Sequence, residues 1–211
     1  MFNILCVTNR RLCREDFLKR IEKIADCRPA GIILREKDLT EADYEELAKE
    51  VIKICEKRDV LAIPHKFANI ALELNFKALH LPLDALRLLS AGDKKKFSIL
   101  GASCHSLDDA LEAESLGCAY ITLGHIFDTD CKKGLPGRGI AFLKEICEKV
   151  AVPVYAIGGI TQKNIGLIKE AGAAGACVMS SVMTAEDVKG YLESLQKKSP
   201  HKGGESKIFI T

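Results

Sequence analysis

The chain has 211 residues, of which 47% are hydrophobic, so it can bury one substantial core. Its formal net charge of +2 is too small to attract nucleic acid or an anionic membrane surface, which argues against both as partners. The nine cysteines are an odd number without a C-x-x-C pair, which argues against a disulfide scaffold and favours free thiols in the cytoplasm. We expect neither a secretion signal nor a membrane span, because no run of about 18 apolar residues occurs.

Short β-branched apolar runs alternate with longer amphipathic segments. The runs predict strands at 2–7, 30–34, 60–64, 78–81, 97–101, 119–123, 153–157 and 175–179. The segments between them predict helices over 15–26, 41–58, 67–75, 84–92, 107–117, 140–150, 162–172 and 185–197. Three of these starts carry an [ST]-x-x-D capping sequence: Thr40 with Asp43, Ser106 with Asp109, and Thr184 with Asp187. Strict alternation of eight strands and eight helices predicts a single (βα)8 TIM barrel.

The barrel is expected to occupy residues 1–196 as one domain. Residues 197–211 begin as a polar, glycine- and proline-rich stretch and predict a flexible C-terminal tail. The tail ends in the apolar, β-prone sequence IFIT, which could instead pair with a strand edge or with a neighbouring chain. We expect a homo-oligomer, of which a dimer is the simplest form.

Polar and cationic residues follow the predicted strands, where TIM barrels carry their active sites. Arg35 and Lys37 follow the second strand and are expected to bind a carboxylate or phosphate, the alternative being a pairing with Glu36 and Asp38. The densest stretch is GHIFDTDCKKGLPGRG, residues 124–139, which combines a histidine with acids, lysines and an arginine. This density predicts a site for an anionic small molecule.

Two further loops predict a phosphate site after the seventh and eighth strands. The sequences are AIGGI at 156–160 and VMSS at 178–181. Barrels commonly bind phosphate at this place through backbone N–H groups, which glycine allows an anion to approach closely. The candidate phosphate-binding residues are Gly158, Gly159, Met179 and Ser180. The alternative is that the glycines only form a turn and the serines only cap a helix.

Several loop motifs together resemble those of the thiamine phosphate synthase/TenI superfamily over about residues 2–195. These motifs are LREKDL (34–39), GASCHS (101–106), YITLGHIFDTDCKKGLPGRG (120–139), AIGGI and VMSS, and they occur in the order of that family. The resemblance implies an enzyme of thiamine biosynthesis that binds a thiazole phosphate. The substrate-binding residues it implies are Arg35, Lys37, Ser103, Thr129 and Lys132.

The two branches of that superfamily differ in their chemistry. The synthase joins an aminopyrimidine pyrophosphate to a thiazole phosphate with Mg²⁺, whereas TenI-type tautomerases aromatise carboxythiazole phosphate by moving a proton. The synthase pattern has an Asn-Asp pair after the third strand, where this chain has Pro64, His65 and Lys66. After the fourth strand, Asp84 is the only nearby acid. The mouth is therefore expected to be poor in the oxygen ligands that Mg²⁺ requires.

His125 resembles the tautomerase branch, because the synthase-like motif has proline at its position. An imidazole can accept and return a proton near neutral pH, which the tautomerisation requires. We therefore expect His125 to be the catalytic residue of a thiazole tautomerase that uses no cofactor and no metal. Two alternatives remain: a Mg²⁺-dependent thiamine phosphate synthase, and a non-catalytic barrel that binds thiazole or thiamine phosphates and regulates partners.

Overall fold

The computed structural model describes residues 2–132 and 134–196, and the predicted tail at 197–211 lies outside these residues. All eight predicted strands form within two residues of the expected starts. They are β1 (Asn3–Val7), β2 (Gly31–Leu34), β3 (Ala62–Pro64), β4 (Ala78–Pro82), β5 (Ile99–Cys104), β6 (Tyr120–Gly124), β7 (Val154–Ile157) and β8 (Gly175–Val178).

The helices alternate with the strands, as the sequence predicts. The α-helices are α1 (Phe17–Asp26), α2 (Glu41–Glu56), α3 (Ala68–Glu73), α4 (Leu83–Leu88), α5 (Ala91–Lys94), α6 (Leu107–Ser115), α7 (Gly139–Lys149), α8 (Ile165–Glu170), α9 (Ser180–Thr184) and α10 (Val188–Gln196). Two short 3-10 helices, η1 (Arg10–Leu12) and η2 (Asp130–Lys132), lie in the loops after β1 and β6.

Two helix predictions are wrong in detail. The predicted helix at 84–92 is divided, because Leu89 takes an extended conformation and Ser90 accepts a hydrogen bond from the Asp93 N–H and so starts α5. Thr184 does not cap the last helix, since its hydroxyl donates to a carbonyl within α9. The side chain of Asp187 instead accepts the N–H of Gly190 at 2.9 Å at the start of α10. The predicted caps Thr40 and Ser106 are confirmed.

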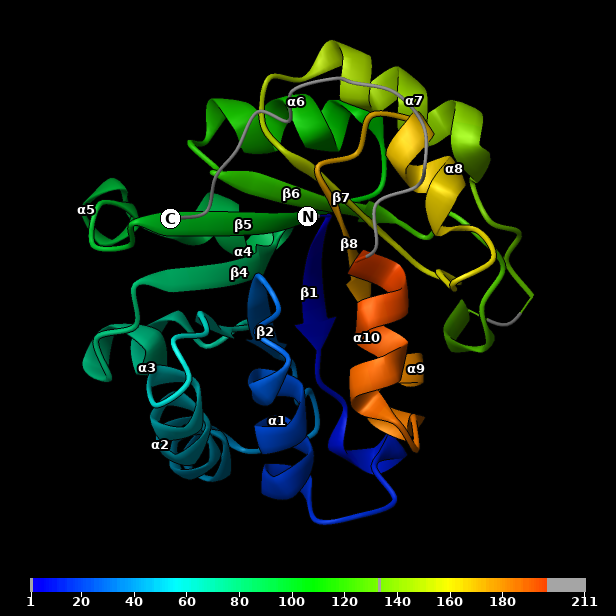
Figure 1. Ribbon diagram of the computed structural model, residues 1–211. Coiled ribbons are helices and arrows are strands. Elements are labelled where there is room, and N and C mark those ends of the chain that lie inside the picture. Colours follow the sequence, from blue (N-terminus) through cyan, green and yellow to red (C-terminus); the bar gives the residue numbers. More distant parts are fainter. Residues whose placement is uncertain (1, 133, 197–211) are drawn as a thin grey trace.

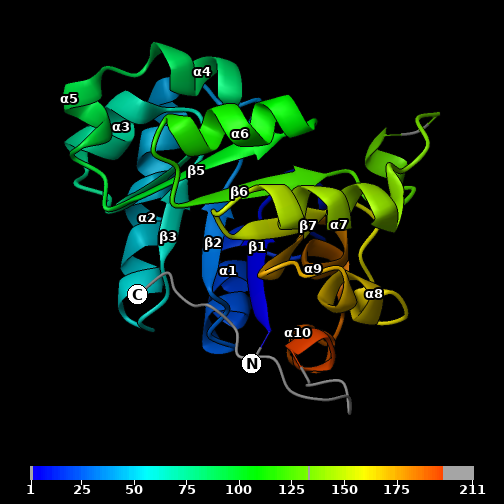
Figure 2. The ribbon, with the colours of Figure 1, turned by 90° about the horizontal axis from the view of Figure 1, so that it is seen from above.

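The strands form one parallel sheet in the order β3-β2-β1-β8-β7-β6-β5-β4. An isolated parallel bridge between His65 and His80 joins β3 to β4, so the sheet closes on itself. The helices form an outer layer around the strands, as the view from above shows (Figures 1 and 2). The prediction of a single (βα)8 barrel is confirmed.

Alternate residues of each strand face the barrel interior or the helices, as the two-residue period of a strand requires. A compact interior cluster consists of Leu5, Val7, Ile33, Ile63, Ala78, Tyr120, Tyr155 and Cys177. The ring of Tyr120 occupies the space over Gly101, its partner in β5, where a Cβ atom would collide with the ring. The interior is therefore filled by side chains.

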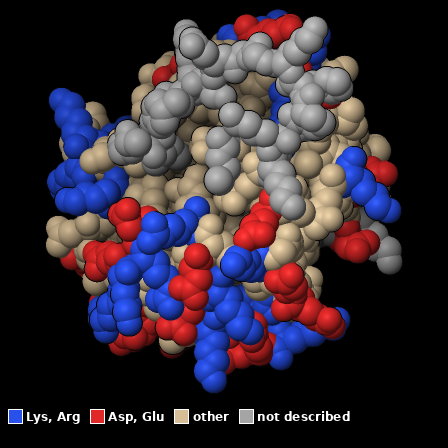
Figure 3. Space-filling view, in the orientation of Figure 1, with Lys and Arg blue, Asp and Glu red and all other residues tan. Residues whose placement is uncertain are grey.

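The outer surface carries both signs of charge. Acidic and basic side chains are interleaved over the lower half of the view, where α1 and α2 lie (Figure 3). On this face neither sign forms a separate field, in keeping with the small net charge. In the described part of the chain, no helix has the length and apolar character needed to span a bilayer.

Candidate active site at the mouth of the barrel

A large cavity of about 1270 Å³ opens where the loops after the strands meet. Pockets for drug-sized ligands are typically about 300–1,000 Å³, so a phosphorylated small molecule fits here. All of the predicted site residues line this cavity: Arg35, Lys37, Ser103, His125, Thr129, Lys132, Gly158, Gly159, Met179 and Ser180. The structure thus brings the predicted set together, while the group that each residue binds stays a prediction.

The buried carboxylate of Glu36 fixes the loop that carries the first two cations. It accepts a hydrogen bond from the hydroxyl of Thr8 at 2.6 Å and from the backbone N–H of Arg10 at 3.0 Å. Burial raises the pKa of Glu36, against the effect of these hydrogen bonds. The Thr8 hydroxyl also accepts the Arg35 N–H, and Asp38 forms an ion pair with Arg10 at 2.7 Å. These contacts engage both acids of the REKD segment, and they disfavour the alternative in which those acids neutralise the neighbouring cations.

Cationic side chains gather on one side of the cavity. Lys37 has a lowered pKa, mainly because of the Arg35 guanidinium, with burial and the more distant Lys132 and Lys66 adding to the effect. One guanidinium nitrogen of Arg35 lies 3.9 Å from the sulfur of Met179, which connects this side to the loop after β8. Neighbouring positive charges lower one another's pKa. An anion that binds between them reduces this repulsion.

We predict that Lys37→Gln weakens the binding of a phosphorylated ligand about tenfold or more, because it removes a charge-assisted contact. Isothermal titration of the variant with thiazole phosphate measures the change. Lys94→Gln in the exposed helix α5 is the matched control and should bind as the wild type does. Equal affinity of Lys37→Gln and wild type would show that Lys37 does not contact the ligand.

A layer of buried polar groups forms the floor of the cavity. The ring of His80 contacts the Tyr120 hydroxyl through Nδ1 at 3.0 Å and the Ser103 hydroxyl through Nε2 at 2.9 Å. His65 stacks against His80 with 5.9 Å between ring centroids. Burial lowers the pKa of both histidines to about 3, so both are neutral at pH 7. A neutral His80 holds the hydroxyl of Ser103, which lines the cavity, in a fixed position.

These two histidines predict a loss of stability in mild acid. A histidine with a pKa of about 3 when folded cannot take up the proton that the unfolded chain binds below about pH 6.5. The contribution of each neutral, buried histidine to the free energy of unfolding is therefore complete above that pH. It is lost as the pH falls towards the pKa of the folded state. Between pH 7 and 5, His80→Gln should lose about 2 kcal/mol less free energy of unfolding than the wild type. Urea unfolding at both pH values measures this, and an unchanged difference would contradict it.

His125 follows β6 directly and lies at the wall of the cavity. Its Nε2 atom lies 3.1 Å from the carbonyl oxygen of Leu135. A carbonyl only accepts, so Nε2 carries the hydrogen in the neutral ring and Nδ1 holds the free electron pair. The backbone carbonyl of His125 accepts the N–H of Arg138 at 3.0 Å, which ties the two ends of the loop after β6 together. An imidazole held in one tautomer beside a cavity can act as a general base.

The Gly-Gly turn after β7 packs against the residues of this loop. Gly158 and Gly159 have φ angles of +100° and +64°, which suit glycine. The carbonyl of Gly158 accepts the N–H of Phe127 at 3.1 Å, and that of Gly159 accepts the side-chain amide of Asn164 at 2.8 Å. Because C=O and N–H point in opposite directions across a trans peptide, the N–H groups of Gly159 and Ile160 point away from these partners. This orientation suits the predicted use of backbone donors for an anion.

The cavity is poor in acidic groups for Mg²⁺, the metal implied by the synthase branch. Those that line it are Asp128 and Asp130, both in the loop after β6, and Asp128 accepts the N–H of Gly137 at 2.7 Å. Within residues 2–132 and 134–196, no three His, Cys, Asp or Glu side chains are grouped to hold a metal ion. Mg²⁺ in such sites is usually held by one or two carboxylates, with substrate phosphates and waters completing the octahedron. Here the two aspartates share the cavity with cationic Lys37 and Arg35.

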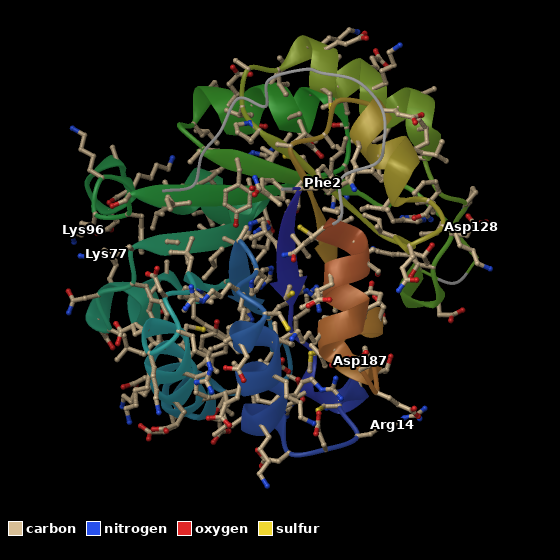
Figure 4. The ribbon with its side chains drawn as sticks, viewed as in Figure 1. Phe2, Arg14, Lys77, Lys96, Asp128 and Asp187 are labelled. Atoms are coloured by element: carbon tan, nitrogen blue, oxygen red, sulfur yellow. The ribbon has the colours of Figure 1, made fainter. Side chains whose placement is uncertain are left out.

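Some lining residues were missed or undervalued from the sequence. Thr122 and Thr161 line the cavity and were not predicted. Thr122 could have been found as the one polar side chain within the apolar strand β6. His65, which stands where the synthase pattern has its Asn-Asp pair, also lines the cavity. A second hollow of about 200 Å³, beside Lys77 and Lys96, lies on the opposite side of the molecule from Asp128 (Figure 4).

The fold and the cavity define the class: a (βα)8 barrel with a polar, cation-rich pocket at the mouth. The family model described as Thiamine monophosphate synthase matches residues 4–182. The chain is 34% identical over 195 residues to the thiamine-phosphate synthase of Clostridium tetani, covering 90% of this chain and 91% of that protein. It is 36% identical over 198 residues to thiamine-phosphate synthase 2 of Streptococcus pneumoniae, covering 91% and 92%.

A solved structure agrees with these matches. Thiamine phosphate pyrophosphorylase from Pyrococcus furiosus has a TM-score of 0.79 and 28% identity, with 92% of this chain and 94% of that chain covered. The chain belongs to the thiamine monophosphate synthase family, and it is a thiamine-biosynthesis enzyme of that family. The names of the relatives support a transferase more than the isomerase expected from the sequence.

Proposed function

We propose that the chain catalyses a proton shift on carboxythiazole phosphate, as a thiazole tautomerase. The observation that carries the proposal is His125, which lines the cavity with its tautomer defined by the carbonyl of Leu135. In this reaction a base removes the proton at C2 of the ring, and a proton is added to the exocyclic carbon. The electron pair of the C–H bond enters the ring as the exocyclic double bond accepts the proton, so no redox partner is needed.

The rest of the cavity supports an anionic substrate. The cationic side chains Arg35, Lys37 and Lys132 line the cavity together with the Gly-Gly turn and Ser180. A substrate with a carboxylate and a phosphate would use both groups of donors. Ser103, which His80 holds in place, supplies a neutral hydrogen-bonding group to the cavity. The reaction requires no metal, which agrees with the donor set of the cavity.

The second candidate is thiamine phosphate synthase, which is favoured by the names of the relatives. The cations of the cavity would also suit a pyrophosphate. This candidate requires Mg²⁺, for which the acidic residues described above provide a poor set of ligands.

A paired assay of the purified full chain distinguishes the candidates. One arm follows aromatisation of the carboxythiazole phosphate tautomer by ultraviolet absorbance, and the other follows thiamine phosphate formation with Mg²⁺. We expect aromatisation that EDTA leaves unchanged. Thiamine phosphate formation that EDTA abolishes, without aromatisation, would replace the proposal with the synthase. Binding of thiazole phosphate with neither reaction would leave the regulatory alternative.

A further inference from the structure

The structure holds a second histidine beside His125 in the same cavity. His105 follows β5, and its side chain lines the cavity. Its Nδ1 atom lies 2.9 Å from the carbonyl oxygen of Gly124, the residue directly before His125. The His105 ring is therefore anchored to the peptide group that directly precedes His125, although the two histidines follow different strands.

The two rings are held in opposite tautomers. Because the Gly124 carbonyl only accepts, neutral His105 carries its hydrogen on Nδ1 and has the free electron pair on Nε2. In His125 the assignment is reversed, since Nε2 donates to Leu135 and Nδ1 has the free pair. Each ring thus keeps one nitrogen occupied by the backbone and leaves the other to exchange protons.

The position of His105 is fixed by the start of helix α6. Its backbone N–H donates to the carboxylate of Asp109 at 2.7 Å, and the Asp109 N–H donates to the hydroxyl of Ser106 at 3.0 Å. These bonds hold the backbone, and the bond to Gly124 holds the ring. The side chain is therefore anchored without using Nε2 in any of these contacts.

We propose that His105 is a second proton-carrying side chain of this site. The proposal rests on the proposed proton shift, which needs one group to accept a proton and one to deliver a proton. In one turnover, neutral His125 accepts the C2 proton through Nδ1 while protonated His105 donates its Nε2 proton to the exocyclic carbon. The number of protons on the protein is unchanged, and exchange with solvent restores the starting charges.

A pair of variants separates proton transfer from positioning. His105→Asn retains an N–H group that can reach the Gly124 carbonyl but has no titrating nitrogen, whereas His105→Ala loses both. We expect both variants to lower kcat by about 10²-fold or more and to lose the alkaline limb of the wild-type pH–rate profile. If His105→Asn retained wild-type kcat and pH profile while His105→Ala did not, His105 would be only a positioning residue and the proposal would be wrong.

A spectroscopic measurement keeps this test independent of turnover. Nitrogen-15 NMR of the ring nitrogens, assigned by loss of signals in His105→Asn, reports the tautomer of each histidine in the full chain. In the neutral form of His105 we expect hydrogen on Nδ1 and the free electron pair on Nε2. A neutral His105 ring that carries its hydrogen on Nε2 and not on Nδ1 overturns the proposal. A wild type that fails to aromatise the substrate would refute the proposed function, while the NMR result still decides the state of His105.

Discussion

His125→Gln should lower kcat for aromatisation by about 10²–10⁴-fold, the usual contribution of a positioned general base. Glutamine is the suitable replacement because Nε2 makes the contact with Leu135, and a side-chain amide can donate to the same carbonyl. KM should change little, since Arg35, Lys37 and the Gly-Gly turn are on other loops. Steady-state kinetics by ultraviolet absorbance measure both constants.

The control for this variant is His65→Gln, which changes a histidine of the same cavity whose burial keeps it neutral. We expect a much smaller effect on kcat from this change. If His125→Gln retained more than about a tenth of wild-type kcat, a role as proton carrier would be refuted.

Gly158→Ala should disable the site through His125. A Cβ atom at Gly158 would collide with the Cβ of His125 and would lie 2.8 Å from its Cα, so the histidine must move. A displacement of about 1 Å in a catalytic group can lower the rate by about 10²-fold. The φ angle of +100° adds a conformational cost of about 1–3 kcal/mol to the folded state.

Gly117→Ala is the matched control for this change. Gly117 also has a positive φ, of +86°, but a Cβ atom there would meet no atom within 4 Å. Both variants should therefore lose stability, as measured by urea unfolding, and only Gly158→Ala should lose kcat. Equal losses of kcat would mean that the collision with His125 is unimportant.

The barrel could be predicted from the sequence because each strand is a short apolar run with one side chain facing inward and the next facing the helices. Boundaries were less predictable where local hydrogen bonds compete with the helix pattern. Ser90 starts a new helix within the segment predicted as 84–92, and Asp187 takes the capping role expected of Thr184. Such choices depend on which of several adjacent polar side chains reaches a free N–H.

The candidate site was predictable as a set of residues because parallel strands of a barrel bring their C-terminal ends to one mouth. The hydrogen bonds between the residues of the site could not be predicted. The sequence gives no sign that His80 supports Ser103, that Glu36 is held by Thr8, or that His105 contacts Gly124. Each of these contacts joins different strands, so it follows from the register of the sheet.

The most direct test of the central claim is the reaction of metal-free wild type with the carboxythiazole phosphate tautomer in D₂O. We expect aromatisation in the presence of EDTA, with deuterium incorporated at the exocyclic carbon at a rate proportional to enzyme concentration. His125→Gln should incorporate it no faster than the uncatalysed background. Aromatisation and deuterium incorporation that occur no faster with wild type than in buffer would show that the chain does not catalyse the proton shift.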